Sequence, residues 1–583
     1  MATSAKEMSM KEERLSNGLL RAAFVITAIL SFFLTGTPLI GVEKMARLVR
    51  IDLPEPAEGF KLGPFDLNHE WIVWTEFKML GFPRKHVPDY IIKVFRGKVG
   101  KNERQMLLDS PPWLTRPFPP LFITNKGMVL IAGIYDYEKG KSLLLVSPNG
   151  KRQILKPTLD LRPFELFSDG LIAGVEQNAG RGKLVFCKIT KQGTLASPII
   201  LEENFVTDES IFDYRYSKSC RKFISRSGTK IAWIKGQPRM EPDIVVTDFE
   251  TGVSKIVGKG IKLPYPYPLE MDGLYGKWLL CHQGTIARLI NIEDTTELQL
   301  PSPGEVKYFC PHGVLFKIQD HHYRFWDPVL QKRWDFLCGP KAIFFSGFDH
   351  SKEDTRIYIL EPYQEVSEGR AVPKKRLERS PARYFNTKDQ MVDVPPELLA
   401  EAVAATKACE EAYEQDKDGW DLWRAMLSLR WPYPPETIPL MELILNSSKD
   451  ANFRSAAAHR IAFSNDPAAK QILFKPLKSK KDWFVREQIL VYLGFLCDKA
   501  DAIRIIKEKP RGGFMEKAAD TLGILGNPVA LDYLQKQTNL KFPTKEQEDK
   551  VRASVLNAIR YIKMRSEVES VLTTLRTAPL IDL

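Results

Sequence analysis

The feature that most constrains this chain is a pattern that recurs through its first half, in which a turn residue is followed by a short apolar run. These runs are rich in Val, Ile, Phe, Tyr and Trp, and Gly, Asp, Asn and Pro separate them. Short apolar runs without a helical period predict β-strands. The turn residues that lead them are Glu70, Gly127, Gly170, Gly228, Gly276 and Gly313. Residues 44–366 are therefore predicted to fold as a succession of similar β-units.

The spacing of these units predicts a six- or seven-bladed β-propeller. Glycine suits the hairpin because a tight turn demands positive φ, and the following strand is apolar throughout if neighbouring units cover both of its faces. We expect seven units, the last built from residues 342–348 and 356–360. An early strand at residues 48–51 would complete it, pairing the two ends of the region and removing its exposed edges. Two packed β-sheets are the alternative.

This first region resembles irregular propellers of the TolB-like or WD40-like kind. The resemblance covers roughly half of the chain, and the Trp-Asp signature of true WD40 repeats does not recur from unit to unit in it. It implies a fold and no particular activity, because propellers host many unrelated functions.

After Pro395 and Pro396 the apolar residues change to a helical period. Each unit is an amphipathic helix, a short polar turn and a second helix, and the last second helix is predicted at residues 568–575 after a turn at Arg565 and Ser566. No such pair can bury its apolar stripe alone, so residues 396–583 are predicted to stack into an α-solenoid. The four units begin at Phe453, Val485, Phe514 and Val551.

These helical units resemble short HEAT repeats of the PBS-lyase type. The matching features are Asp482 shortly before the helix, the apolar-Arg pair that ends in Arg486, and a Leu-Gly pair that ends in Gly494. The third unit departs from the family, because Met515 stands where an arginine is usual. The resemblance implies scaffolding or partner recognition.

The N-terminus holds an uncharged stretch, residues 22–42, after a tail at residues 1–21 that contains basic residues. Roughly 20 helical residues cover a bilayer core of about 30 Å, so the stretch predicts a single transmembrane or signal-anchor helix. A cleaved signal peptide is the alternative. Because one N-terminal span usually acts as an export signal, we expect the bulk of the chain outside the cytoplasm, in a periplasmic or extracellular position.

Half of the net charge of +12 lies in residues 370–388, within the predicted linker at residues 367–395. Such a cluster could contact an anionic surface, and a solvated hinge is the alternative. The helical region is nearly balanced in charge, which argues against nucleic-acid binding. The candidate contact residues are Lys374, Lys375, Arg376, Arg379 and Arg383.

Motif searches assign no catalytic residue, no cofactor and no metal. No Walker A, GxSxG, GxGxxG or HExxH pattern is present. The nearest approach to a zinc site has spacings that match no standard site; its residues are Cys310, His312, His321, His322 and Cys338. Large aromatic residues near the start of the solenoid are either a protein interface or a cap on the first repeat; they are Trp420, Trp423, Trp431 and Tyr433.

Together these features favour a membrane-tethered, non-enzymatic binding or scaffold protein with other proteins as partners. The alternative is a lyase or hydrolase that uses the propeller channel, with catalytic groups assembled from several blades. Convergent histidine and carboxylate side chains with perturbed titration would favour the enzyme. A purely structural envelope component is a third possibility.

Overall fold

The computed structural model describes residues 47–386, with longer gaps at 111–120, 206–223 and 361–383 and several short ones, and residues 396–577 with a few short gaps. The chain divides into two compact units. The first comprises Met1–Arg47 and Asp349–Thr355, of which only residues at the ends of strands are described. The second comprises Leu48–Phe348 and Arg356–Leu583 and contains a β-rich part followed by a helical part.

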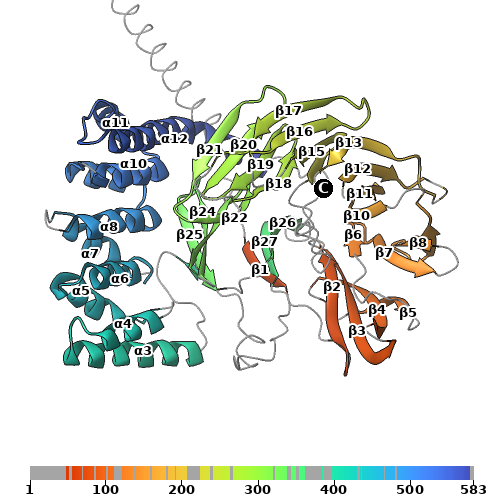
Figure 1. The fold of residues 1–583 in the computed structure, drawn as a ribbon, viewed down its shortest axis with the longest axis horizontal. Helices are drawn as coiled ribbons and strands as arrows, with labels where there is room; N and C mark the ends of the chain where they lie inside the picture. Colours follow the sequence, from red (N-terminus) through yellow and green to blue (C-terminus); the bar gives the residue numbers. More distant parts are fainter. Residues whose placement is uncertain are drawn as a thin grey trace, which may run out of the picture. The chain divides into compact units, whose positions relative to one another are not determined.

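The β-rich part is built from antiparallel sheets of consecutive strands, each hydrogen-bonded in chain order (Figure 1). The first sheet contains β2 (Lys61–Leu67), β3 (Trp71–Arg84), β4 (Val87–Lys98) and β5 (Gln105–Ser110). The second contains β6 (Leu121–Ile123), β7 (Val129–Asp136), β8 (Gly140–Val146) and β9 (Arg152–Leu155). The third contains β10 (Leu161–Leu166), β11 (Leu171–Asn178), β12 (Arg181–Lys188) and β13 (Ile199–Phe205).

The next three sheets follow the same plan. The fourth contains β14 (Ile224–Ser227), β15 (Lys230–Lys235), β16 (Asp243–Asp248) and β17 (Ser254–Lys259). The fifth contains β18 (Leu269–Tyr275), β19 (Trp278–Gln283), β20 (Ile286–Asn291) and β21 (Glu297–Pro301). The sixth contains β22 (Glu305–Cys310), β23 (Gly313–Gln319), β24 (His322–Asp327) and β25 (Lys332–Leu337), and β28 (Tyr384–Asn386) pairs with its last strand.

A further sheet joins the two ends of the β-rich part. Its strand order is β1 (Arg47–Ile51), β27 (Asp354–Leu360) and β26 (Ile343–Asp349). The predicted pairing of residues 48–51 with the last strands is therefore present. The predicted turn glycines also have the expected conformation, because Gly127, Gly170, Gly228 and Gly276 all have φ between +57° and +83°.

The sheets pack face to face, and each apolar cluster is shared by two neighbouring sheets. Leu130 and Ile131 on β7 illustrate the arrangement: Ile131 packs with strands of the first sheet, whereas Leu130 packs with strands of the third. Alternate residues of a strand point to opposite faces, so an apolar run buries both faces at once. The first strands of successive sheets also lie against one another, β2 with β6, β6 with β10, β14 with β18, and β18 with β22.

The helical part follows β28 in the chain, and its longer helices pack in succession, α6 on α8, α8 on α10 and α10 on α12 (Figure 1). Short helices follow three of these long ones and form the second member of each pair. The helices are α3 (Pro396–Gln415), α4 (Trp420–Ser428), α5 (Thr437–Ser447), α6 (Ala451–Ala462), α7 (Ala469–Phe474), α8 (Trp483–Leu496), α9 (Ala502–Lys507), α10 (Gly513–Leu525), α11 (Leu531–Gln537) and α12 (Lys545–Thr577).

The predicted break of the last unit at Arg565 and Ser566 is wrong, because α12 runs through it without interruption. The other breaks carry residues that begin a new helix, such as Asn527, whose side chain accepts from the Val529 amide. Residues 545–577 contain neither glycine nor proline. Arg565 Nε instead donates to Glu569 Oε1 at 2.7 Å, one turn later, which supports a continuous helix.

Among the residues that the structure describes, no helix has both the length and the apolar character needed to cross a membrane. The predicted anchor at residues 22–42 lies outside the described residues, as does almost all of the predicted linker.

Candidate functional site

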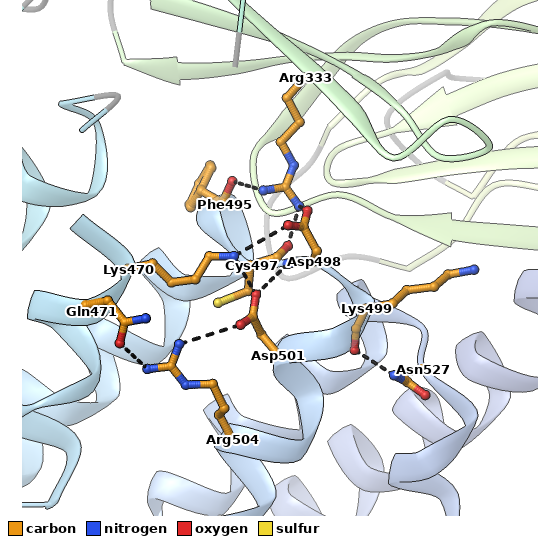
Figure 2. Close-up of polar contacts among 10 residues, drawn as sticks. All are labelled: Arg333, Lys470, Gln471, Phe495, Cys497, Asp498, Lys499, Asp501, Arg504 and Asn527. Carbon is orange, nitrogen blue, oxygen red and sulfur yellow. Dashed lines mark hydrogen bonds and ion pairs between the residues drawn. The ribbon is translucent and has the colours of Figure 1, made fainter. Parts of the chain in front are cut away.

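The C-terminal end of α8 is bonded to two arginines of the sixth sheet. Arg324 on β24 donates from Nη1 to the carbonyl oxygen of Phe495 at 2.5 Å. Arg333 on β25 donates from Nη1 to the same oxygen at 2.9 Å and from Nη2 to the carbonyl of Cys497 (Figure 2). The last carbonyls of a helix have no partner within it and carry partial negative charge. The two guanidinium groups therefore satisfy and neutralise this helix end.

Arg324 is itself held by a buried carboxylate. Asp335 on β25 accepts from Arg324 Nη2 at 2.6 Å and also from Nε, and both side chains are almost fully buried. His322 Nε2 lies 3.2 Å from the same carboxylate. Burial alone would raise the pKa of Asp335, but Arg324 outweighs it and holds that pKa well below its usual range. Asp335 is therefore ionised near neutral pH and compensates the charge of Arg324.

A third arginine connects the end of α12 to the sixth sheet. Arg576 donates from Nε to the carbonyl of Pro311 at 2.9 Å and from Nη2 to the carbonyl of His312 at 3.0 Å. It also donates to Asp327 Oδ1 at 2.7 Å, which additionally accepts from the backbone amide of Val329. We call this set of contacts, made by Arg324, Arg333 and Arg576, the sheet–helix junction.

Polar side chains link successive helical units behind the junction (Figure 2). Lys470 donates to Asp501 at 2.7 Å and lies 3.4 Å from Asp498, which in turn pairs with Arg333 at 3.5 Å. Asn527 donates to the carbonyl of Lys499 at 2.6 Å, which ties the next unit to the same turn. The units thus form a continuous ladder that ends on the sheet.

An apolar layer fills the space beneath these polar contacts. The Phe463 ring lies edge-on to Phe495 with centroids 5.0 Å apart, and Phe495 contacts Phe316 of β23 at 6.0 Å. A small cavity bordered by Phe316, Trp326 and Gly494 has room for about one water molecule. One hydrophobic cluster includes residues of both the fifth and sixth sheets and the helices, so the junction is part of a shared core.

A second cluster of titratable groups lies on the first two strands of the fifth sheet. His282 on β19 lies between two carboxylates of β18: its Nδ1 is 2.7 Å from Asp272 Oδ2 and its Nε2 is 3.3 Å from Glu270 Oε2. Glu270 is the direct cross-strand partner of His282, and a bulge between Met271 and Gly273 adds Asp272 nearby. The three side chains therefore converge although they are not adjacent in the sequence.

Burial lowers the pKa of His282, but Asp272 and Glu270 outweigh it and raise the pKa to about 9. The imidazole is therefore a cation at neutral pH. Asp272 also accepts a hydrogen bond from the backbone of Phe309 on β22, which links the fifth sheet to the sixth. The cluster can hold a proton between two carboxylates, and through Asp272 it can also connect the fifth sheet to the sixth.

The predicted interface aromatics lie in different environments. Trp420 is 66% exposed at the first turn of α4. Trp423 is half-buried and its ring contacts Phe453 edge-on at 5.3 Å, and Tyr433 is buried in the helical core. Trp431 and the basic residues Lys374, Lys375, Arg376, Arg379 and Arg383 lie outside the described residues.

The residues considered for a zinc site do not come together as one in the part of the chain that the structure describes. His312 and His322 belong to separate parts of the junction, and Cys310 is a buried free thiol. His321 and Cys338 fall outside the described part of the chain. Within that part, no group of three or more His, Cys, Asp or Glu side chains could hold a metal ion.

Sequence reasoning missed the arginines of the junction and the His282 cluster. Arg324, Arg333 and Arg576 carry no local motif, and the backbone carbonyls that they bind lie far away in the chain. The one visible signal was a set of charged residues on otherwise apolar strands, which marks a buried partner or a functional group.

Comparisons with known proteins give structural similarity only. No family model matches the chain, and no curated protein matches it. A puromycin-hydrolysing peptidase from Mycobacterium tuberculosis is 13% identical, with a TM-score of 0.32, and the match covers 52% of this chain and 53% of that one. A prolyl endopeptidase is 8% identical, with a TM-score of 0.29, and the match covers 52% of this chain and 50% of that one. An oligogalacturonate lyase in complex with manganese is 8% identical, with a TM-score of 0.27 and coverages of 50% and 84%.

These neighbours are enzymes with propeller-type domains. This chain spans about half the length of the two peptidases. Identities this low and TM-scores below 0.5 give no basis for transferring an activity.

Proposed function

We propose that this chain is a membrane-tethered, non-enzymatic scaffold, in which a seven-bladed propeller closed by β1 carries a solenoid of HEAT-like repeats. The observation that carries the proposal is the sheet–helix junction. It engages the C-terminal ends of α8 and α12, and the N-terminal end of α8 lies outside its contacts. A 14-residue helix such as α8 is about 20 Å long, which separates its two ends by that distance.

The N-terminal ends of α4 and α8 carry exposed aromatic side chains. We call Trp420, Trp483 and Phe484 the aromatic edge; the first is 66% and the second 65% exposed. The Arg424 guanidinium lies 5.7 Å from the Trp420 ring centre. Tryptophan and arginine contribute most of the binding energy in many protein interfaces, which supports a protein partner at this edge.

The loops beneath the aromatic edge are tied together. Asp418, just before α4, accepts from the Ser448 hydroxyl and from the Lys449 amide. Arg454 donates to the carbonyl of Ser448 at 2.6 Å and to Asp482, just before α8, at 2.8 Å. The contact of Arg454 with Asp482 joins one helical unit to the next and supports the proposed HEAT-like repeats. Because ordering an interface on binding costs affinity, a preformed edge favours recognition.

The test of the scaffold is crosslinked co-purification of the full chain from solubilised membranes. We expect a stoichiometric protein partner that is lost from the W420A/W483A variant while its thermal stability is unchanged. Ile154→Ala on β9, at an exposed apolar position away from the edge, is the matched control and should keep the partner. A wild-type chain without a stoichiometric partner, or equal loss in both variants, would contradict the proposal.

The membrane tether is tested separately by fractionation. The full chain should remain in the membrane pellet after an alkaline wash, and a chain that starts at Glu43 should be released. Release of both chains would remove the tether from the proposal and leave the scaffold unaffected.

An enzyme that uses the propeller channel is a second candidate, and the His282 cluster favours it. First strands that pack against one another are expected to be innermost in a propeller, so β18 would border the channel. A cationic imidazole beside Glu270 could donate a proton to a leaving group, as lyases and hydrolases require. Turnover of a polysaccharide or peptide substrate that His282→Gln abolishes would support this candidate, and an inactive wild-type chain would reject it.

A further inference from the structure

The described histidines gather at one place in the molecule. His312, His322 and His459 all lie at the sheet–helix junction, and His282 is the described histidine that does not. His312 and His322 belong to the sixth sheet, and His459 belongs to α6. Histidine is the side chain whose ordinary pKa lies between about pH 5 and 8, so its concentration at a contact between two parts is a reason to examine protonation there.

His459 sits in an apolar pocket on the helical side. Its ring is edge-on to Phe463 at 4.7 Å and to Tyr492 at 5.4 Å. Nε2 lies 3.5 Å from the side-chain amide of Gln319 on β23, and the buried Nδ1 has no hydrogen-bond partner. The charged groups of the described residues that act on it are Arg460 and His322, and both lower its pKa. The pocket thus accepts a neutral ring and offers nothing to a cation.

His322 approaches the same phenylalanine from the sheet side. Its ring is edge-on to Phe463 at 6.0 Å, so one histidine from each part flanks this residue. The carboxylate beside His322 is Asp335, which already binds Arg324 through both oxygens. A proton on His322 would therefore add a second cation to a carboxylate that is already neutralised.

The charges that face these rings are mainly positive. Arg324 comes from the sheet beside His322, and Arg460 comes from α6 beside His459. Arg576 of α12 faces His312. The anions are Asp335, Asp327 and Asp498, which are paired with Arg324, Arg576 and Arg333 respectively.

Burial and the neighbouring cations depress the pKa values accordingly. The pKa of His459 falls to about 3, first through burial and then through Arg460 and His322. The pKa of His312 also falls to about 3, through burial and then through Arg576. Burial lowers the pKa of His322, against the opposing effect of Asp335.

We propose that the sheet–helix junction is an acid-sensitive latch, which stays closed while its histidines are neutral and opens on acidification to release the helical part from the β-rich part. A depressed pKa means that docking is unaffected above the ordinary histidine pKa of about 6.5 and weakens as the pH falls below it. A histidine whose pKa returns from about 3 to about 6.5 on undocking weakens docking by at most roughly 30-fold at about pH 5. His459 gives only part of this effect, because Phe463, Tyr492 and Arg460 surround it within the helical part itself.

The latch can be followed in the full chain by energy transfer between two fluorophores. Val253→Cys on β17 and Val529→Cys before α11 place labels on exposed positions of the two parts. The described native cysteines are buried, and Cys220 and Cys338 would be replaced by serine. We expect transfer to fall reversibly between about pH 7 and pH 5, while the far-ultraviolet circular dichroism of strands and helices is retained.

Matched variants separate the latch from general acid unfolding. H312Q/H459Q should keep high transfer at about pH 5, and His282→Gln should behave as wild type. If the double variant fails to dock at neutral pH, His459→Phe preserves the ring packing and should still move the loss of transfer to a lower pH than in wild type. Constant transfer across this range, simultaneous loss of secondary structure, or wild-type behaviour of His459→Phe would overturn the proposal.

Discussion

Replacement of Asp335 by asparagine isolates the electrostatics of the sheet–helix junction, because it removes one charge and preserves the shape. Asp335 is 1% exposed and binds Arg324 through both oxygens. In Asp335→Asn the guanidinium stays buried against α8 without its counter-ion. Breaking a buried ion pair from one side typically destabilises by about 3–5 kcal/mol. The asparagine oxygen can still accept one hydrogen bond, so we expect a loss near about 3 kcal/mol.

The double variant R324L/D335L tests whether that loss comes from the unpaired charge. It removes both charges, and the carbonyl of Phe495 keeps its bond from Arg333 at 2.9 Å. His322 loses its acceptor, which costs about 1 kcal/mol. The double variant should therefore be more stable than Asp335→Asn by about 1–2 kcal/mol, since buried ion pairs can often be replaced by apolar side chains.

Urea unfolding at neutral pH, followed by far-ultraviolet circular dichroism and tryptophan fluorescence, measures both variants. The comparison uses transition midpoints at matched slopes, because a chain of two folded parts need not unfold in one step. The reasoning would be refuted if the free energy of unfolding of Asp335→Asn lay within about 0.5 kcal/mol of the wild-type value. It would also be refuted if R324L/D335L were less stable than Asp335→Asn.

Two further predictions concern the turns and the His282 cluster. Gly313→Ala should lower the free energy of unfolding by more than about 3 kcal/mol, because φ is +147° and a Cβ would lie 2.2 Å from the Trp326 carbonyl oxygen. Gly228→Ala is the control: its φ is also positive but its surroundings are open, so it should cost only about 1 kcal/mol. Thermal denaturation measures both variants, and equal losses would contradict the predicted clash at Gly313. His282 has a raised pKa, so its stabilisation is fully present below about pH 6.5 and is lost as the pH rises through about 9. Between these pH values, wild type should lose up to about 3 kcal/mol of its free energy of unfolding and His282→Gln should lose little, as measured by urea midpoints. Parallel pH profiles of the two proteins would show that His282 does not have the raised pKa.

The repeating parts of the fold could be predicted because their determinants are local. Gly127 and Gly170 were expected to adopt positive φ from the turn that each must make, and both do. The pairing of β1 with the last strands joins distant residues, and it could be predicted because an unpaired edge on either side would be exposed. The continuous course of α12 through Arg565 was missed. Its signals were local, because residues 545–577 contain neither glycine nor proline and Arg565 pairs with Glu569 one turn later.

The candidate sites could not be predicted because they depend on register and on distant contacts. Asp272 joins Glu270 and His282 only because a bulge inserts one extra residue into β18, and nothing in the local sequence marks that bulge. Arg324 reaches the carbonyl of Phe495 from another part of the chain. The environments of Trp420 and Tyr433 likewise differ through tertiary packing, although both are large aromatic residues near the first helices.

The pairing of β1 with β27 has a consequence for how the chain is made. β1 begins at Arg47 and β27 at Asp354, so the first strand leaves the ribosome long before its neighbour exists. Contacts between residues distant in the sequence form slowly, and exposed strands invite aggregation while they wait. This sheet is therefore expected to form late in biogenesis. If synthesis stops before β27, β1 remains unpaired and becomes a binding site for chaperones.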